Sequence, residues 1–324
     1  MGKAGNGYYM KIGFEAFLST ADHMSFTKAA EELHVTQQCV SDHIRRLEQE
    51  YGIALFERKP QLRLTQAGQS MYRDLKSILM MERNMGRNLR EMSQGSRGNF
   101  TAGISTSRAP LILPGVLARY YHSFPEVTIS FNEEDTHMLE DLLESGTIDM
   151  FVGINTTPHP AFVIEKLAEE EIHLVISEGL LRRHFDEEGI AALSRNADLR
   201  LLQDIPFTLN LTEGKIQHVI REYLESSQLH LSSIYNISDS NTQIMMCSTG
   251  VCAALCPTML LNRMHLHNLT SNRQNRLVSF PVKKLDGRVR IELVYRKEAR
   301  YPRYIRAFMD ILREEVPRIM TYAI

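Results

Sequence analysis

The stretch of residues 24–65 restricts the fold of this chain more than any other. Ser25 and Thr36 each precede a segment that favours a short helix, and a hydroxyl at an N-cap can accept a hydrogen bond from a free backbone N–H. The helix after Thr36 carries one apolar stripe at the i, i+4, i+7 spacing, made of Val40, Ile44 and Leu47. Two short helices joined in this way form a helix-turn-helix, whose second helix is suited to the major groove of DNA.

A short hairpin is predicted after the second helix. Gly52 is placed to end that helix, and residues 55–58 and 62–65 alternate in polarity, as two strands do, around the turn at residues 59–61. Basic side chains at the tip of such a wing are suited to phosphate. Residues 1–65 carry equal numbers of acidic and basic side chains, so we expect each monomer to bind DNA with modest affinity. Tight binding would then require several copies of the domain joined in one assembly.

The candidate DNA contacts lie at the start of the first helix, on the polar face of the second and on the hairpin. Recognition helices meet base edges near their N-termini. A packed pair of amphipathic helices that does not bind DNA would show the same stripes, so that alternative stays open on the pattern alone. The predicted DNA contacts are Ser25, Thr27, Thr36, Gln37, Gln38, Ser41, Asp42, Arg45, Arg46, Arg58, Lys59 and Arg63.

A long helix is predicted after Thr65. Its apolar positions alternate in steps of four and three residues, which is the spacing of a coiled-coil seam. Residues 94–98 are typical of a hinge and leave this seam no obvious cover within the chain. We therefore predict a homodimer through this helix, with packing of the helix on its own domain as the alternative. The seam positions are Met71, Leu75, Ile78, Glu82, Met85, Leu89 and Met92.

Beyond the hinge the pattern changes to alternating strands and helices. Residues 100–105, 127–131 and 150–154 are predicted strands, with helices over residues 111–121 and 138–145 between them. Short links between such elements indicate a parallel α/β sheet with helices on its faces. Further strands are predicted over residues 172–177, 207–211, 233–237, 251–255 and 288–295, and further helices over residues 217–226, 242–248 and 304–316.

The loops at the carboxyl ends of these strands are rich in hydroxyl and amide groups. Ligands of open α/β sheets bind at that edge, and three of the loops lead into helix N-termini, which favour a carboxylate or phosphate. Ser, Thr and Asn also cap helices, so a structural role is the alternative for any single loop. Glu134 and Asp135 argue against assuming an anionic ligand. The loops comprise residues 105–108, 134–136, 155–156, 208 with 210, and 238–242.

The order of these residues resembles the LysR-type transcriptional regulators. The matching stretches are SFTKAAEEL at residues 25–33, IRRLE at 44–48, LFER at 55–58 and LTQAG at 64–68, together with residues 14–21, 36–37, 40–41 and 52. The chain departs from the family at Gln38-Cys39, where Pro-Ala is usual, and at Asp42, where a basic or amide residue is common. An aspartate there would accept a hydrogen bond from a cytosine amino group or repel phosphate, so the DNA target stays open.

The resemblance implies three parts: a winged helix-turn-helix DNA-binding domain over residues 1–65, a linker helix over residues 66–95, and an effector domain over residues 99–324. The effector domain would resemble periplasmic binding proteins, with two α/β lobes. Lobe I would comprise residues 99–171 and 277–324, and lobe II residues 172–276. The implied function is regulation of transcription by a small organic effector. The implied partners are an interrupted inverted repeat of double-stranded DNA, further copies in a homodimer and homotetramer, and RNA polymerase.

Effector contacts in this family come mainly from strand ends and the loops after them. Carried over to this chain, they fall on the loop after the first strand, on the ends near residues 154–155 and 208–210, and on residues 239–242 and 251–253. Together with the polar loops, this gives the candidate effector contacts Ser105, Thr106, Ser107, Asp135, Asn155, Thr208, Asn210, Asp239, Asn241, Thr242 and Cys252.

The cysteines define an alternative function, because one branch of the family senses peroxide with a cysteine pair. Few cysteines in a chain of this length fit buried thiols in a reducing compartment. On a strand over residues 251–255, Cys252 and Cys256 would lie about 13 Å apart at ~3.3 Å per residue, too far for a disulfide. Cys247 would approach Cys252 only if the turn at Gly250 folds it back. The four cysteines are Cys39, Cys247, Cys252 and Cys256.

Other functions find no motif in the sequence. The chain contains no GxSxG, P-loop, HExxH or GxGxxG pattern, so we expect no enzyme activity and no cofactor. The cysteine spacing and the pair His265 and His267 do not predict a metal site. No run of 18 apolar residues offers a membrane span, and residues 1–11 lack the apolar core of a signal peptide. We therefore expect a cytoplasmic protein.

Overall fold

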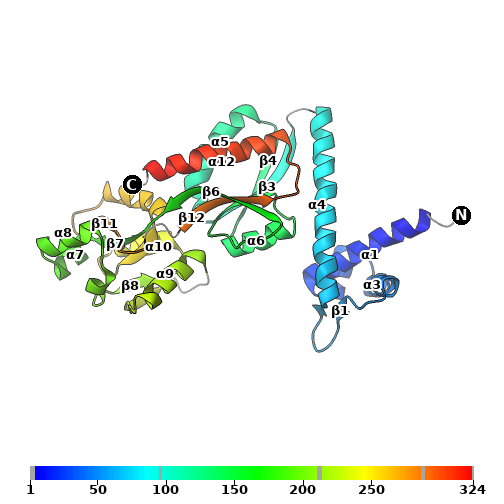
Figure 1. Cartoon of the computed structure of the whole chain (residues 1–324), viewed down its shortest axis with the longest axis horizontal. Helices are drawn as coiled ribbons and strands as arrows, with labels where there is room; N and C mark the ends of the chain where they lie inside the picture. The colour runs from blue at the N-terminus through cyan, green and yellow to red at the C-terminus, as the bar shows by residue number, and fades with distance from the viewer. Residues whose placement is uncertain (1–3, 95–96, 210–213, 286–288, 323–324) are drawn as a thin grey trace. The chain divides into compact units, whose positions relative to one another are not determined.

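The computed structural model describes residues 4–94, 97–209, 214–285 and 289–322 (Figure 1). The chain forms two compact units, Met1–Gly86 with Glu144–Gly146, and Arg87–Leu143 with Thr147–Ile324. None of the described helices combines the length and the apolar character that crossing a membrane requires.

The N-terminal unit contains the predicted helix-turn-helix. It begins with α1 (Ala4–His23), followed by α2 (Phe26–Glu32) and α3 (Gln37–Tyr51). Both predicted N-caps are present: Ser25 Oγ accepts from the Lys28 N–H (3.3 Å) and Thr36 Oγ1 from the Cys39 N–H (3.2 Å). Gly52 ends α3 with a φ of 66°, in the left-handed region that glycine adopts at little cost. The apolar stripe of α3 is buried against α1 and α2 and consists of Val40, Ile44 and Leu47.

The wing is a small antiparallel pair of strands. β1 (Phe56–Glu57) pairs with β2 (Arg63–Leu64), so that Phe56 lies opposite Leu64. Glu48 of α3 holds the wing in place, because its Oε1 accepts from the backbone N–H groups of Leu55 (2.9 Å) and Phe56 (3.3 Å). The wing is therefore fixed to α3 by hydrogen bonds as well as by the apolar core.

α4 (Gln66–Gln94) is the predicted long helix, and its first turns belong to the N-terminal core. Leu75 is buried in that core, with Met71 packed beside it. Asp22 of α1 accepts hydrogen bonds from Tyr72 (2.5 Å) and Lys76 (2.9 Å). The first two positions of the predicted seam therefore serve the helix's own domain.

Lobe I of the second unit is built on a five-stranded sheet of order β4-β3-β5-β12-β6. β3 (Gly98–Ile104) runs parallel to β4 (Val127–Glu133) and β5 (Met150–Ile154), whereas β12 (Val289–Arg296) runs antiparallel to β5 and β6 (Phe162–Glu170). The sheet is therefore mixed, and the prediction of a parallel sheet is wrong at β12, which returns from lobe II.

Helices cover both faces of this sheet (Figure 1). α5 (Ala109–Ser123) and α12 (Arg303–Tyr322) pack together over one face, which Met150 and Val152 of β5 present. α6 (Thr136–Glu144) packs over the other face, which Phe151 presents. The alternation of neighbouring β5 side chains between two cores explains why this strand is apolar throughout.

Lobe II contains a three-stranded antiparallel sheet of order β10-β7-β11, made of β10 (Ala254–Pro257), β7 (Ile172–Ser177) and β11 (Leu277–Pro281). A parallel pair, β8 (Phe207–Leu209) and β9 (Ser233–Asn236), joins it through a bridge between Phe207 and Ala253. The remaining elements are α7 (Glu178–His184), α8 (Glu187–Arg195), η1 (Leu199–Leu202), α9 (Lys215–Ser226), α10 (Ser240–Cys247), η2 (Thr258–Leu261) and α11 (Asn262–Asn268).

Two further predictions about this unit are wrong, and one of its strands was not predicted. The predicted return to lobe I at Leu277 is too early, because β11 pairs with β7 and the Val282 N–H still donates to Ile172 O (3.3 Å). β6 was not predicted at all, since its charged residues interrupt the apolar pattern that marks a strand. Strand β10 also begins later than the predicted segment at residue 251, so Cys252 precedes it.

Candidate functional site

The polar face of α3 is exposed above a buried scaffold. Gln38, Asp42 and Arg45 are exposed and Ser41 is half-buried, whereas the opposite stripe of the helix is fully buried. A helix held by one face against its own domain can present the other face to a groove without rearrangement. This arrangement is the one that base recognition from a helix-turn-helix requires.

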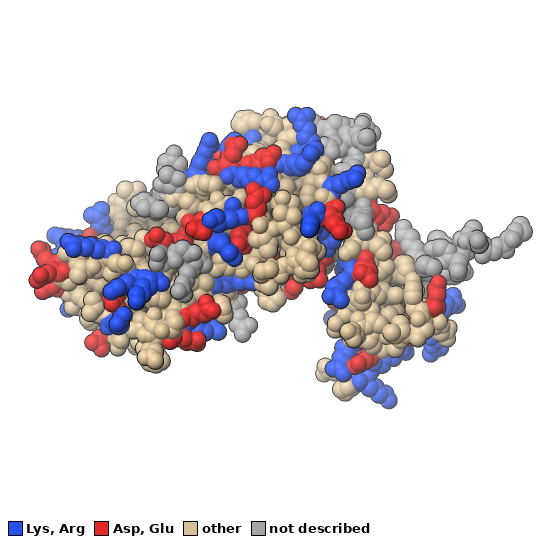
Figure 2. Space-filling model, in the orientation of Figure 1, with Lys and Arg blue, Asp and Glu red and all other residues tan. Residues whose placement is uncertain are grey.

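Basic side chains lie on the wing beside α3. Arg58 is 3.5 Å from Glu48, and Arg63 Nε lies 2.5 Å from Glu57 Oε2, so both are held by acidic neighbours. Lys59, at the turn, is exposed. Figure 2 shows Lys and Arg side chains gathered at the end of the N-terminal unit that carries the wing. Exposed ion pairs of this kind are weak, so both arginines can turn to phosphate.

The structure places every predicted DNA contact where solvent reaches it. Ser25 and Thr36 are the N-caps of α2 and α3, and their hydroxyls are thereby engaged. The exposed residues are Thr27, Thr36, Gln37, Gln38, Asp42, Arg45, Arg46, Arg58, Lys59 and Arg63, and the half-buried ones are Ser25 and Ser41.

From Ile78 onwards, α4 presents large apolar side chains to solvent. Ile78 is 53% exposed, and Met85 and Leu89 are each 58% exposed. Glu82 lies between them on the predicted seam, and the side chain of Met92 is outside the described residues. Exposed apolar residues at coiled-coil spacing mark a surface that gains from burial against a second helix.

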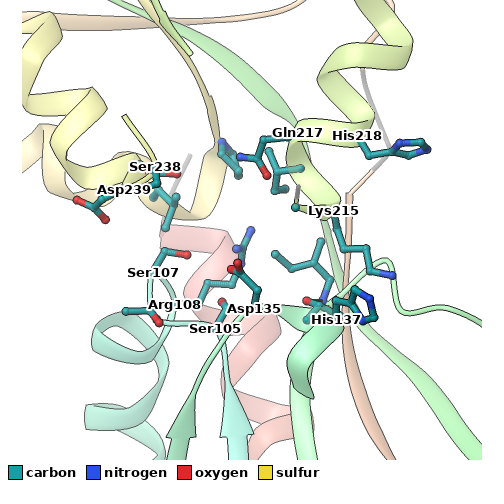
Figure 3. Close-up of a pocket in the computed structure, with 18 of the residues that line it drawn as sticks. Ser105, Ser107, Arg108, Asp135, His137, Lys215, Gln217, His218, Ser238 and Asp239 are labelled. Atoms are coloured by element: carbon teal, nitrogen blue, oxygen red, sulfur yellow. Dashed lines mark hydrogen bonds between the residues drawn. The ribbon is translucent and has the colours of Figure 1, made fainter. Parts of the chain in front are cut away.

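A cleft of about 610 Å³ opens between the two lobes of the second unit, within the 300–1,000 Å³ typical of ligand pockets. Lobe I contributes the loop between β3 and α5 and the start of α6, and lobe II contributes the starts of α9 and α10. Figure 3 shows Ser105, Ser107, Arg108 and Asp135 on one wall, with Gln217, Ser238 and others on the wall opposite.

Arg108 forms a buried ion pair beneath this cleft. Its side chain is 2% exposed and its Nη2 donates to Glu170 Oε1, while Glu170, at 0% exposure, also accepts from the Met259 N–H (3.2 Å). Burial lowers the pKa of Arg108 to about 9. The guanidinium therefore stays charged at neutral pH, and the Glu170 carboxylate is its compensating charge.

A second ion pair closes one side of the cleft. Lys215 of α9 lies 3.0 Å from Glu140 of α6 and donates to Thr157 Oγ1 (2.7 Å), so it joins lobe II to lobe I. Lys215 and Gln217 were not among the predicted contacts, because candidates were taken from strand ends and the loops after them, and these two residues lie within α9, several positions beyond the end of β8. The only available signal was Gly214 before a helical segment, which is common in proteins without any ligand.

Part of the predicted effector set lines this cleft, namely Ser105, Thr106, Ser107, Asp135 and Asp239. Among the described residues, the others lie elsewhere for structural reasons. Asn155 Oδ1 accepts from the Arg290 N–H (2.9 Å), Asn241 and Thr242 donate to the Asp239 carboxylate that caps α10, and Thr208 and Cys252 are fully buried. Asn210 lies outside the described residues.

The lobe II cysteines lie close together. α10 ends at Cys247, and Gly250, with a φ of 73°, folds the chain back towards Cys252, as the approach of the two thiols requires. Contact between the two thiols raises the pKa of Cys247, as its burial also does, and lowers the pKa of Cys252, on which burial acts in the opposite direction. Burial raises the pKa of Cys256 to about 12, so its thiol is unreactive. Within the described residues, no group of His, Cys, Asp and Glu is arranged to hold a metal.

A winged helix-turn-helix followed by a long helix and a two-lobed module with a cleft defines the architecture of a regulatory DNA-binding protein. Residues 13–69 match the family model described as a bacterial regulatory helix-turn-helix protein of the lysR family, and residues 93–317 match the LysR substrate binding domain. The chain belongs to the LysR family, as its sequence predicted, and its fold class is the predicted one.

Named relatives match over part of their length. The chain is 34% identical over 128 residues to the HTH-type transcriptional regulator YtlI of Bacillus subtilis, covering 40% of this chain and 42% of that protein. It is 28% identical over 165 residues to the DNA-binding transcriptional dual regulator OxyR of Escherichia coli, covering 51% of this chain and 54% of that protein. The matches thus span about half the length of these curated relatives.

Solved structures share the fold over nearly the whole chain. Full-length CbnR in complex with its target DNA aligns with a TM-score of 0.56 at 20% identity, covering 94% of this chain and 98% of that one. At this identity the likeness concerns the fold alone.

Proposed function

We propose that this protein is a sequence-specific transcriptional regulator whose DNA binding responds to a small molecule held in the cleft between the lobes. The observation that carries the proposal is the exposed polar face of α3, with Gln38, Asp42 and Arg45 presented from a buried scaffold and a basic wing beside it. Family membership supports a regulatory rather than a catalytic role. We expect the protein to act in the cytoplasm without catalysing a reaction or carrying a cofactor.

The exposed apolar face of α4 supports a homodimer, which would place two copies of α3 on one DNA duplex. Two-fold related recognition helices read half-sites about one helical turn or a multiple of it apart, so the operator should be an interrupted inverted repeat. Assembly of such dimers into tetramers and contact with RNA polymerase are part of the same proposal. The effector would act by binding one arrangement of the assembly more tightly than another.

Selection from random double-stranded DNA tests this proposal. The full-length chain should enrich an interrupted inverted repeat, and Arg45→Ala should weaken binding to it by at least tenfold. Arg306→Ala is the matched control, because it removes the same charge from an exposed position on α12 and should leave binding unchanged. Failure to enrich any sequence would refute the proposal.

A redox sensor is the second candidate, because the thiols of Cys247 and Cys252 are in contact. Hydrogen peroxide would oxidise the two thiols to a disulfide and be reduced to two molecules of water. Mass spectrometry of peptides after peroxide treatment tests this directly. A disulfide between these two residues together with altered operator binding would favour the sensor, whereas unchanged thiols would exclude it.

A further inference from the structure

Two buried donors at the start of α5 have no partner in the described structure. They are Ser105 Oγ and Arg108 Nε, on side chains that are 6% and 2% exposed. Both residues line the cleft between the lobes. Buried donors in native proteins are almost always hydrogen-bonded. An acceptor supplied by the ligand would satisfy both of them.

The position of these donors favours an anionic acceptor. They stand at the N-terminus of α5, a helix of 15 residues whose N-cap residue, Arg108, makes no side-chain capping bond. The positive end of the helix dipole there favours a carboxylate, although the first backbone N–H groups of α5 already donate to Ser105 O and Arg108 O. Because Glu170 already compensates the guanidinium charge of Arg108, the site offers donors without a net positive charge.

Asp135 adds a negative charge to the same end of the cleft. It lies at the start of α6 beside Ser105 and Arg108 (Figure 3). Across the described chain, its carboxylate takes part in no ion pair or hydrogen bond. Glu140, the other acid on this wall, is already paired with Lys215. A plain carboxylic acid would meet repulsion from Asp135 unless a cation lay between the two carboxylates.

We infer that the ligand of this cleft is a zwitterion of the α-amino acid class. Its carboxylate accepts from Ser105 and Arg108 at the start of α5, and its ammonium group lies against Asp135. The cleft of about 610 Å³ extends towards Ile216 and Gln217 of α9, which leaves room for a sizeable side chain. The inference rests on the proposed function and specifies the chemistry of its effector.

Binding of the twenty common α-amino acids and ornithine to the full-length protein, measured by thermal shift and calorimetry, tests the inference. At least one of them should bind. The corresponding acid without the amino group and the amine without the carboxylate should each bind at least tenfold more weakly. Asp135→Asn should weaken binding of the amino acid at least tenfold and leave binding of the deaminated acid equal or stronger.

Glu134→Gln is the matched control, because Glu134 is the immediate neighbour of Asp135 and carries the same negative charge but does not line the cleft. It should leave binding unchanged. The inference is overturned if no amino acid binds, or if Asp135→Asn has no effect on one that does. Selection on random DNA with the same protein separates the two proposals: an enriched operator without amino-acid binding removes only the inference, and no enriched sequence removes the proposed function.

Discussion

The buried pair of Arg108 and Glu170 allows a quantitative prediction about stability. Glu170→Gln keeps the shape of the side chain but leaves a buried guanidinium without its compensating charge. Removing one partner of a fully buried ion pair destabilises a protein by about 3–5 kcal/mol. In a unit of this size each kcal/mol lowers the melting temperature by about 2–4 °C, so we expect a decrease of roughly 6–20 °C.

Two further variants decide whether the lost charge is the cause. Glu314→Gln removes one carboxylate of the exposed pair with Arg119, whose side chains are 55% and 40% exposed, and should leave the melting temperature nearly unchanged because solvent screens such a pair. The double variant Arg108→Met with Glu170→Gln removes both buried charges and should recover most of the lost stability.

Differential scanning calorimetry of the full chain measures all three variants. The reasoning is refuted if Glu170→Gln melts within 2 °C of Glu314→Gln, or if the double variant melts no higher than Glu170→Gln. Arg108 also lines the cleft. Amino-acid binding should therefore be lost both in Glu170→Gln and in the double variant, even if the double variant regains stability.

The remaining predictions concern pH, assembly and DNA sequence. Burial lowers the pKa of His173 below its ordinary 6.5, so the unfolded chain binds more protons than the folded chain as the pH falls below 6.5. The neutral, buried His173 therefore favours the folded state above pH 6.5, and this stability decreases as the pH falls towards the folded pKa. In urea titrations at a series of pH values, His173→Gln should flatten this decrease. Leu89→Lys places a charge on the exposed seam of α4 and should yield monomers by light scattering; a persistent dimer would mean another interface. Asp42→Asn should change the preferred base at one position per half-site in DNA selection, and an identical enriched sequence would show that Asp42 reads no base.

Local features of the sequence were sufficient for the N-terminal unit. The caps at Ser25 and Thr36, the buried stripe of α3 and the end of that helix at Gly52 all depend on neighbours within a few residues, so periodicity and turn chemistry predict them. The first part of the α4 seam was less predictable. Whether Leu75 faces a second copy or its own domain depends on the position of α1, which spacing does not specify.

The strands of the second unit followed from the sequence only where their pattern was clean. β5 and β7 lie where they were predicted, because both are continuously apolar. β6 escaped prediction because charged residues on both of its faces interrupt the apolar pattern, and the pairing of β11 with β7 moved the lobe boundary. Which strand pairs with which depends on contacts between distant segments, and a single strand carries little information about its partner.

The sequence by itself determined the helix-turn-helix, its polar recognition face and the α/β pattern that follows, because each depends on local periods of hydrophobicity and on capping residues, and the division into two lobes was implied by the resemblance to the LysR family. Only the tertiary structure decided which polar loops form the cleft. It brought Ser105 and Asp135 together with Lys215 and Gln217, and it assigned Asn155 and Thr242 to structural hydrogen bonds. A hydroxyl or amide at a strand end has the same local signature in either role, and only the distant groups that fold against it distinguish a ligand contact from a cap.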